Sequence, residues 1–398
     1  MNIIIITSGA LPIPSVKGGA VENLVEMLIN INEVKCDNKF VIYSVYDKKL
    51  ENVIRQYKNC TFKYIKTDRV LDKIFKVIRH IINRIPGIYI GNLFISKVIK
   101  DMKKMNLDYD AIIVENSPEY GIVLNKNKMK NLILHLHNDY LNPSTKLKNK
   151  IINSYKEIYP ISNCVKNNIE LIERNKLTNV KVLYNGIDLS KFNKENFDVD
   201  VVREKFNISK EEFVIMYVGR LVSEKGVKEL IQAVLLLPIE YKLKLFIVGS
   251  PKYSDNTINK YFSELLKLSD PIKDKVIFTG YIDYSNLPEL YSIANIGVVP
   301  SLCEDAFNLT TIEFMANKVP VIISDRGGMK EIISNLSGRV VRYNKDFIAN
   351  LSKEIEYMYN KREFLDEMGK NAYNESKKFS NINYYNRFNN LLNEFKGE

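Results

Sequence analysis

Short runs of apolar residues alternate with longer stretches of mixed character along the whole chain. The short runs are rich in Ile, Val, Leu and Phe and predict buried strands, whereas the longer stretches carry the periodicity of amphipathic helices. The predicted strands form two series, at residues 2–7, 39–45, 61–66, 111–115, 131–136, 158–162 and 180–184, and then at residues 213–218, 244–248, 275–279, 296–300 and 320–324. Strands and helices in alternation are typical of a parallel sheet with helices on both faces. We therefore expect an α/β protein with two doubly wound domains.

A polar, charge-dense stretch at residues 189–210 separates the two series of strands. It places an N-terminal domain at residues 1–190 and a C-terminal domain at residues 191–381, and a chain of 398 residues is long enough for each to bury its own core. Doubly wound domains bind ligands beyond the carboxyl ends of their strands. The loops that follow the predicted strands are thus where functional side chains are expected.

Composition narrows the class of protein. Hydrophobic residues make up 45% and charged residues 26% of the chain, which is the balance of a folded globular protein. No apolar run reaches the roughly 18 residues that a membrane-spanning helix needs. The run Ile3–Ile6 is interpreted as a strand rather than a signal peptide, because no basic residue precedes it. The four cysteines show no metal-binding spacing, so we expect reduced thiols in a cytoplasmic protein.

The segment VGRLVSEKGVKELIQA at residues 218–233 places Arg220, Lys225 and Gly226 between a predicted strand and a predicted helix. The start of a helix offers unpaired N–H groups, and two cations beside it make a site suited to a diphosphate. A surface turn with exposed basic residues is the alternative that these residues alone leave open.

A second segment, PSLCEDAFNLTTIEFMA at residues 300–316, carries Asp305 and Glu313 eight positions apart. Eight positions in a helix correspond to about 2.2 turns, so both carboxylates are expected on one side of a site, with N–H groups of residues 307–309 at the helix start. Carboxylates in such a place can bind sugar or ribose hydroxyls. The alternative is a solvated acidic helix start, which the helix dipole favours by itself.

Two features of the first half also follow predicted strands. Gly18 and Gly19 lead into an amphipathic helix and would let the backbone approach a phosphate or sugar closely. Their spacing is not GxGxxG, and a tight turn is the alternative. His135 and His137 lie at a strand end, where we expect His135 to be a core residue and His137 to contact a ligand.

Other chemistries find little support in the chain. It contains no Walker loop, no HExxH and no GxSxG motif. Two DxD sequences, at residues 108–110 and 198–200, match the metal-diphosphate motif of another transferase fold. One leads into a buried strand and the other lies in the boundary stretch, so we interpret both as incidental. A glycosidase-like pair of carboxylates stays open.

Taken together, the glycine loop, His137 and the two C-terminal segments resemble glycosyltransferase family 4, whose members are retaining enzymes of the GT-B fold. The resemblance covers nearly the whole chain and includes NGID at residues 185–188, GYI at 280–282 and SDRGGMKEII at 324–333. It implies two Rossmann-like domains that face a central cleft, the first for the acceptor and the second for a nucleotide sugar. The last helix, within residues 382–398, would join the first domain. The resemblance further implies that no metal and no other cofactor is needed.

The resemblance assigns catalytic roles to His137, Arg220, Lys225 and Asp305. Arg220 and Lys225 would hold the donor diphosphate, and His137 would lie beside the anomeric centre. Asp305 would meet the sugar hydroxyls, while Glu313 would contact the nucleotide ribose. The remaining donor-binding residues would be Gly18, Gly19, Ala306, Phe307, Asn308 and Leu309. Because Asp305 stands where the family usually has Glu, and Asn308 where glycine is common, the sugar preference is left open.

The expected function is transfer of a hexosyl group from a nucleotide sugar, by default a UDP-sugar, to a glycan or lipid-linked acceptor. Similar enzymes of Gram-positive bacteria act on surface polysaccharide or spore-coat glycans. Two alternatives stay open. One is a nucleotide-sugar epimerase or hydrolase of the same fold, and the other is a catalytically silent, sugar-nucleotide-binding coat or scaffold protein.

The net charge of +11 is concentrated in one segment, because residues 48–104 contain 15 Lys or Arg and four acidic residues. Within it, residues 69–85 predict a basic amphipathic helix. We expect this helix to dock on an anionic membrane surface, so that a cytoplasmic enzyme is held at the inner face of the cell membrane. A core-packed helix with a solvated basic face is the alternative, and nucleic acid is not expected as a partner because no nucleic-acid-binding module accompanies the charge.

Overall fold

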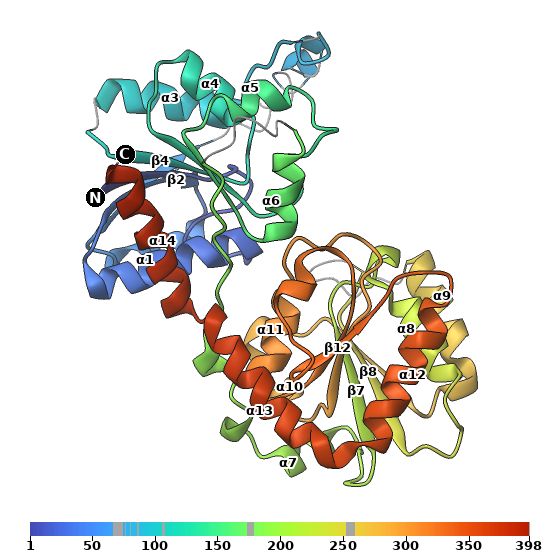
Figure 1. Ribbon diagram of the computed structural model, residues 1–398. Coiled ribbons are helices and arrows are strands. Elements are labelled where there is room, and N and C mark those ends of the chain that lie inside the picture. The colour runs from blue at the N-terminus through green and yellow to red at the C-terminus, as the bar shows by residue number, and fades with distance from the viewer. Residues whose placement is uncertain are drawn as a thin grey trace. The chain divides into compact units, whose positions relative to one another are not determined.

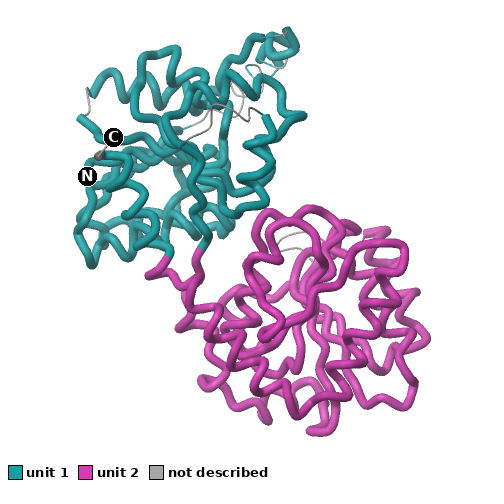
Figure 2. Tube along the Cα trace, viewed as in Figure 1, with its two compact units in different colours: residues 1–185, 384–398 teal, residues 186–383 magenta. Residues whose placement is uncertain are grey.

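The computed structural model describes residues 1–66, 75, 77–79, 81–85, 87–105, 108–172, 179–251 and 259–397. The chain forms two compact units (Figure 2), the first made of residues 1–185 and 384–398 and the second of residues 186–383. Each unit contains one six-stranded parallel sheet, which confirms the predicted fold class of two doubly wound α/β domains.

The sheet of the N-terminal unit has the strand order β3-β2-β1-β4-β5-β6, and all of its pairs are parallel. Its strands are β1 (Asn2–Ile6), β2 (Lys39–Val45), β3 (Cys60–Ile65), β4 (Ala111–Glu115), β5 (Leu132–Leu136) and β6 (Glu157–Pro160). The central strands β1, β4 and β5 are almost wholly buried, because helices cover both faces of the sheet.

The helices of this unit lie in two layers (Figure 1). They are α1 (Ala20–Lys35), α3 (Leu93–Met105), α4 (Tyr120–Lys126), α5 (Lys148–Ile152), α6 (Asn163–Glu170) and α14 (Asn381–Gly397). On one face, Leu28 of α1 and Tyr385 and Phe388 of α14 share a core cluster with the strands. The last helix of the chain therefore completes the core of the first unit.

The strand predicted at residues 180–184 is wrong. These residues run beside the edge strand β6, where Lys181 N–H donates to Ile158 O (3.0 Å) and Leu183 N–H to Pro160 O (2.9 Å). A continuous ladder would have one more hydrogen bond between these two bonds, donated by the backbone N–H of residue 160. Residue 160 is a proline and has no N–H group. The ladder is therefore interrupted, and only a single bridge between Ile158 and Val180 is formed.

The sheet of the C-terminal unit has the order β12-β11-β10-β7-β8-β9 and is likewise parallel. Its strands are β7 (Phe213–Val218), β8 (Leu243–Val248), β9 (Val276–Gly280), β10 (Ile296–Val299), β11 (Val321–Ser324) and β12 (Gly338–Val341). The edge strand β12 was not predicted, because its four residues contain an apolar run of only Val340 and Val341.

Helices again lie on both faces of this sheet (Figure 1). They are α7 (Val199–Lys205), α8 (Val227–Leu235), α9 (Lys260–Ser269), α10 (Leu287–Tyr291), α11 (Leu309–Ala316), α12 (Phe347–Asn360) and α13 (Leu365–Ser376). One layer is formed by α8, α9 and α12, and the other by α10, α11 and α13. Among the helices that the structure describes, none is long and apolar enough to cross a membrane.

The direction of winding reverses between β1 and β4 in the first sheet and between β7 and β10 in the second. At such a switch point the loops leave in opposite directions and open a crevice at the carboxyl ends of the strands. The loops after Ile6, Glu115, Val218 and Val299 are therefore the places where each unit can bind a ligand.

Candidate active site

In the C-terminal unit, the loops after β7 and β10 are in direct contact. Leu302 N–H donates to Glu224 O at 2.9 Å. Gly226, with φ 73°, lies so close to the other loop that a Cβ atom there would overlap the Pro300 carbonyl oxygen. Only glycine accepts both this backbone angle and this approach. The GRLVSEKG segment thus depends on Gly226 for its position beside the loop that follows β10.

Contact between these loops joins two residues that were predicted from separate motifs. Lys225 Nζ lies 2.6 Å from Asp305 Oδ2, and Asn308 Nδ2 donates to the same oxygen at 3.1 Å. The Asp305 carbonyl accepts from Gly328 N–H at 2.7 Å, and Gly327 passes so near it that a Cβ atom would overlap. Both the carboxylate and the backbone of Asp305 are therefore held in place.

Asn308 caps helix α11, since its Oδ1 accepts from Thr311 N–H at 2.9 Å. The helix begins at Leu309, so Asp305 precedes it, and the predicted placement of Asp305 and Glu313 on one side by helical spacing is wrong. Asp305 and Asn308 are the two residues that depart from the family pattern, and they are hydrogen-bonded to each other. The N–H groups of the first helical turn, from Leu309 onward, have no acceptor inside the helix, and Asn308 accepts the one from Thr311.

Glu313 lies buried in α11, and tyrosines occupy both of its carboxylate oxygens. Tyr284 Oη donates to Oε1 at 3.0 Å and Tyr291 Oη to Oε2 at 2.7 Å. Burial raises the pKa of Glu313, and the two tyrosine hydrogen bonds oppose this effect. The sequence motifs did not indicate either tyrosine; GYI at residues 280–282 was the nearest signal. Tyr284 is 42% exposed, whereas Glu313 is only 4% exposed, so a ligand that binds Glu313 has to share or displace a tyrosine hydrogen bond.

Two further charged groups belong to this region. The Arg220 side chain is 59% exposed and forms a 3.5 Å ion pair with Glu224. Such an exposed pair is weak, so Arg220 is available to an anion. Glu304, which precedes Asp305, binds elsewhere: it pairs with Arg326 at 3.0 Å and accepts from Gly327 N–H at 2.5 Å. Of the two neighbouring acids, Asp305 is thus the one that faces Lys225.

In the N-terminal unit, Gly18 and Gly19 lie between β1 and α1, and Gly19 is the N-cap residue of that helix. Glu22, in the first turn of α1, folds back against Gly19. Burial raises the pKa of Glu22. The predicted glycine loop therefore lies at the switch point of the first sheet and carries a buried carboxyl group that sequence reasoning missed.

A cluster of Glu115, His135 and His137 lies at the carboxyl ends of β4 and β5. Glu115 Oε2 lies 3.1 Å from His135 Nδ1 and 2.8 Å from His137 Nε2. Burial and the neighbouring His135 lower the pKa of His137 to about 4. Burial alone would raise the pKa of Glu115, but the two imidazoles lower it to about 2. His135 is fully buried, and the carboxylate that links the two histidines was not predicted.

The same cluster is a possible metal site among the described residues, because its three ligand atoms lie within 4.8 Å of one another. The absence of a metal requirement therefore stays a prediction.

The two DxD sequences make structural contacts: Asp110 Oδ2 accepts from Asn2 N–H at 2.8 Å, and Asp198 Oδ1 accepts from Asp200 N–H at 3.1 Å as the N-cap of α7.

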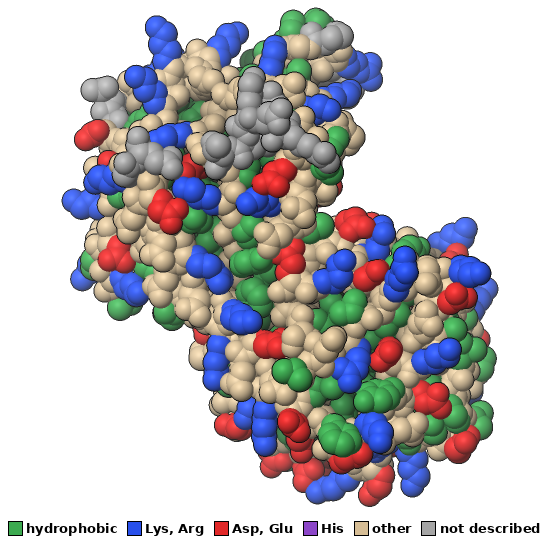
Figure 3. All heavy atoms as spheres, viewed as in Figure 1, with side chains coloured by type: hydrophobic (Ala, Val, Ile, Leu, Met, Phe, Trp, Pro, Cys, Tyr) green, Lys and Arg blue, Asp and Glu red, His purple; other side chains and the backbone are tan. Residues whose placement is uncertain are grey.

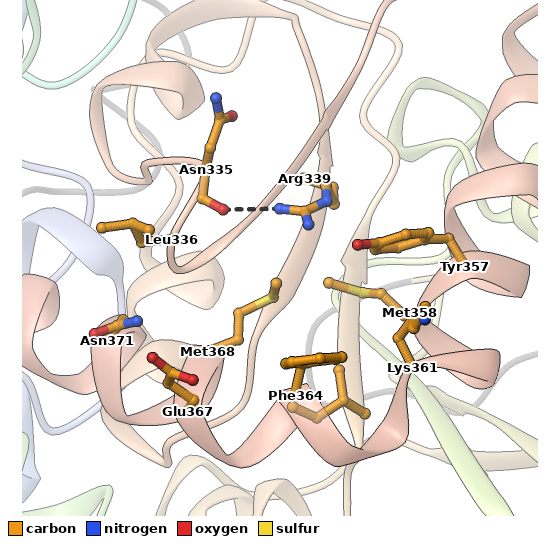
Figure 4. A pocket seen from close by; sticks show the side chains of 11 residues that line it. Asn335, Leu336, Arg339, Tyr357, Met358, Lys361, Phe364, Glu367, Met368 and Asn371 are labelled. Atoms are coloured by element: carbon orange, nitrogen blue, oxygen red, sulfur yellow. Dashed lines mark hydrogen bonds between the residues drawn. The ribbon is translucent and has the colours of Figure 1, made fainter.

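A separate pocket of about 260 Å³ lies where β12, α12 and α13 meet (Figure 4). Met358, Phe364 and Met368 line it together with the aliphatic and polar parts of their neighbours. None of the predicted site residues contributes to its wall. The pocket is therefore distinct from the site at the ends of β7 and β10.

Residues 198–375 match the family model of the glycosyl transferases group 1. Spore coat protein SA of Bacillus subtilis (strain 168) is 23% identical over 406 aligned residues, which cover 100% of this chain and 99% of that protein. The capsular polysaccharide biosynthesis glycosyltransferase CapM of Staphylococcus aureus is 28% identical over 68% of this chain and 65% of its own length.

Among solved structures, Anabaena Alr3699/HepE in complex with UDP superposes with a TM-score of 0.75, over 99% of this chain and 100% of that one at 18% identity. A glycosyltransferase from Rickettsia africae superposes with a TM-score of 0.76 at 20% identity, over 99% of this chain and 98% of that one. Full-length agreement of this kind identifies the two parallel sheets as the GT-B fold. Residues 198–375 are thus similar to the group 1 glycosyltransferases, the family that the motifs of the chain indicated.

Proposed function

We propose that this protein is a retaining, metal-independent glycosyltransferase that binds its nucleotide-sugar donor in the C-terminal unit. The observation that carries the proposal is the contact of Lys225 with Asp305 at 2.6 Å, where the loops of β7 and β10 meet at the switch point. A cation, a sugar-binding carboxylate and a helix start are thereby brought to one place. Arg220 and Lys225 would hold the diphosphate, together with the N–H groups at the start of α11.

In the proposed reaction, the bond from the anomeric carbon to the diphosphate breaks through an oxocarbenium-like transition state. The acceptor oxygen forms its bond to the same carbon on the same face, and its proton passes to the departing diphosphate. The protein supplies no nucleophile in this scheme. It supplies charge stabilisation, from Arg220 and Lys225, and orientation of the sugar, from Asp305 and His137.

We propose a UDP-sugar as the donor. Structures of Anabaena Alr3699/HepE contain UDP and UDP-glucose, and that protein shares the fold over the full length of this chain. Glu313 would bind the ribose through Oε1, and the hydrogen bond that Tyr284 donates to this oxygen would be shared or displaced. We further propose a glycan or lipid-linked acceptor in surface polysaccharide or coat synthesis. The name of CapM, a capsular polysaccharide biosynthesis glycosyltransferase, supports the polysaccharide, and the name of spore coat protein SA supports the coat.

Thermal unfolding with UDP, GDP and their sugar conjugates tests the donor site. A ligand at about 100 times its Kd should add about 2.7 kcal/mol to the free energy of unfolding. We expect stabilisation by the UDP series, unchanged by a chelator. Stabilisation by none of these nucleotides would contradict the proposed donor site, and stabilisation without any turnover would favour the silent scaffold. Turnover of the donor without any acceptor would favour the epimerase or hydrolase.

Membrane docking is proposed for the basic segment. Of the helix predicted at residues 69–85, residues 69–74, 76 and 80 lie outside the described part of the chain. In the described part, four apolar side chains form a stripe at helical spacing, are exposed by 46–62% and are not packed in a core: Val77, Ile78, Ile81 and Ile85. Lys and Arg side chains gather along the upper edge of this unit in Figure 3, and Lys150 of α5 donates to the Gly87 carbonyl at 2.8 Å.

An apolar stripe beside cations fits an anionic bilayer. We expect the protein to sediment with phosphatidylglycerol vesicles and not with phosphatidylcholine vesicles. Ile81→Glu should weaken the binding by about 10-fold, because it places a charge in the inserted face. Ile239→Glu is the matched control, since Ile239 is 80% exposed in the other unit. Equal sedimentation with both lipids would rule out this docking.

A further inference from the structure

We propose that Glu115 is a positioning residue that fixes His137 in its Nε2–H tautomer, so that Nδ1 of His137 accepts a hydrogen bond from a hydroxyl of the bound sugar. The ligand named here depends on the proposed function. The tautomer itself does not, because it follows from groups within the N-terminal unit.

The hydrogen bonds of the Glu115 carboxylate determine the tautomer. Glu115 lies opposite His135 in the pairing of β4 with β5, and His137 follows at the end of β5. An ionised carboxylate only accepts hydrogen bonds. His137 must therefore donate Nε2–H to Oε2 across 2.8 Å, and His135 must donate Nδ1–H to Oε1 across 3.3 Å. In a neutral imidazole the second nitrogen is then an acceptor.

Two hydrogen bonds fix the backbone of His137 at the end of β5. His137 N–H donates to Asn116 Oδ1 at 3.1 Å, and Asn116 N–H donates to His135 O at 2.8 Å. The ends of the two strands are thus tied together on both sides of the carboxylate. Since the His137 side chain is only 5% exposed, rotation of the ring would break the bond to Glu115 within a packed site.

A ligand at this place is indicated by the state of His137 Nδ1. This nitrogen is buried and has no hydrogen-bond partner among the described residues. Buried polar atoms are nearly always paired, so an unpaired acceptor at the carboxyl end of a central strand calls for a donor from a ligand. A neutral nitrogen lone pair attracts an O–H group and repels a phosphate oxygen. The matching chemical class is therefore a sugar hydroxyl rather than the diphosphate.

The Glu115→Gln variant tests whether Glu115 acts by orienting His137 rather than by filling space. Glutamine has the same shape, but its NH2 group can donate to His137 Nε2 and so favour the Nδ1–H tautomer, which donates where the native ring accepts. We expect kcat to fall by about 10- to 100-fold, the size of effect seen when an orienting partner is lost, with a smaller change in KM for the donor. Glu157→Gln is the matched control, because Glu157 is another buried carboxylate of the same sheet, on β6.

The deciding measurement is ¹⁵N NMR of the full-length protein with labelled histidine, which is simple because the chain has three histidines. His137→Gln assigns the signals. We expect His137 to be a neutral Nε2–H imidazole in the wild type and in Glu157→Gln, and to change tautomer in Glu115→Gln. A wild-type Nδ1–H form or imidazolium would overturn the inference, as would a stoichiometric metal whose removal by chelator alters the His137 signals. Since this readout needs no substrate, an inactive protein with the expected tautomer would count against the proposed function alone.

Discussion

Replacing Lys225 by alanine is expected to slow sugar transfer by a factor on the order of 10² or more, as the loss of a preorganised charge at a reacting oxyanion does. Lys225 is held 2.6 Å from Asp305, at the point where the β7 and β10 loops meet. Removing Lys225 takes a positive charge away from the proposed diphosphate site. The Asp305 carboxylate would then keep its hydrogen bond from Asn308. Initial rates with a UDP-sugar donor, followed by UDP release, measure the effect.

Lys228→Ala is the matched control for this variant. Lys228 is exposed one helical turn further along the same segment, in α8, and its loss leaves the contact of Lys225 with Asp305 intact. We expect near-native rates for the control and similar thermal stability for both variants, because the Lys225–Asp305 pair is partly exposed. Unchanged turnover in Lys225→Ala would remove Lys225 from the proposed site.

The fold could be predicted because the strands that define it are long apolar runs buried on both faces. The strand at residues 2–6 is a run of four isoleucines after Asn2, and no helix or loop explains such a run as well. The two errors concern edge positions. At residues 180–184 the apolar pattern is present, but Pro160 on the neighbouring strand removes the donor that the ladder needs. At β12 the strand exists, but half of its residues carry no apolar signal.

The candidate site could be predicted only where its chemistry lies within one segment. Lys225 and Asp305 each stood in a recognisable motif, yet their contact depends on two loops that are 80 residues apart in the chain. Glu115 and Tyr284 were missed because each acts on a partner from another element, His137 and Glu313 respectively. A motif identifies residue types at a spacing, whereas these pairs depend on strand register and on the direction of each side chain.

Replacing Gly226 by alanine is expected to lower the free energy of unfolding of the C-terminal unit by about 2–5 kcal/mol and to abolish most transfer. A φ of 73° costs an L-residue about 1–2 kcal/mol, and the new Cβ would overlap the Pro300 carbonyl, for which overpacking adds about 1–3 kcal/mol. The overlap can be relieved only by moving the β7 loop away from the β10 loop. Because Lys225 is the preceding residue, this movement would also break its contact with Asp305.

Gly87→Ala separates the backbone cost from the overlap. Gly87 has φ 80°, close to that of Gly226, but the nearest atom of the described residues to an added Cβ is Lys150 Nζ at 3.8 Å. This control should lose only the cost of the backbone angle, about 1–2 kcal/mol, and should keep its activity. Urea denaturation and transfer assays on both variants measure the difference. If Gly226→Ala proved no less stable than Gly87→Ala and still transferred sugar, close contact between the β7 and β10 loops would not be needed for the site, and the geometry on which the donor proposal depends would have to be replaced.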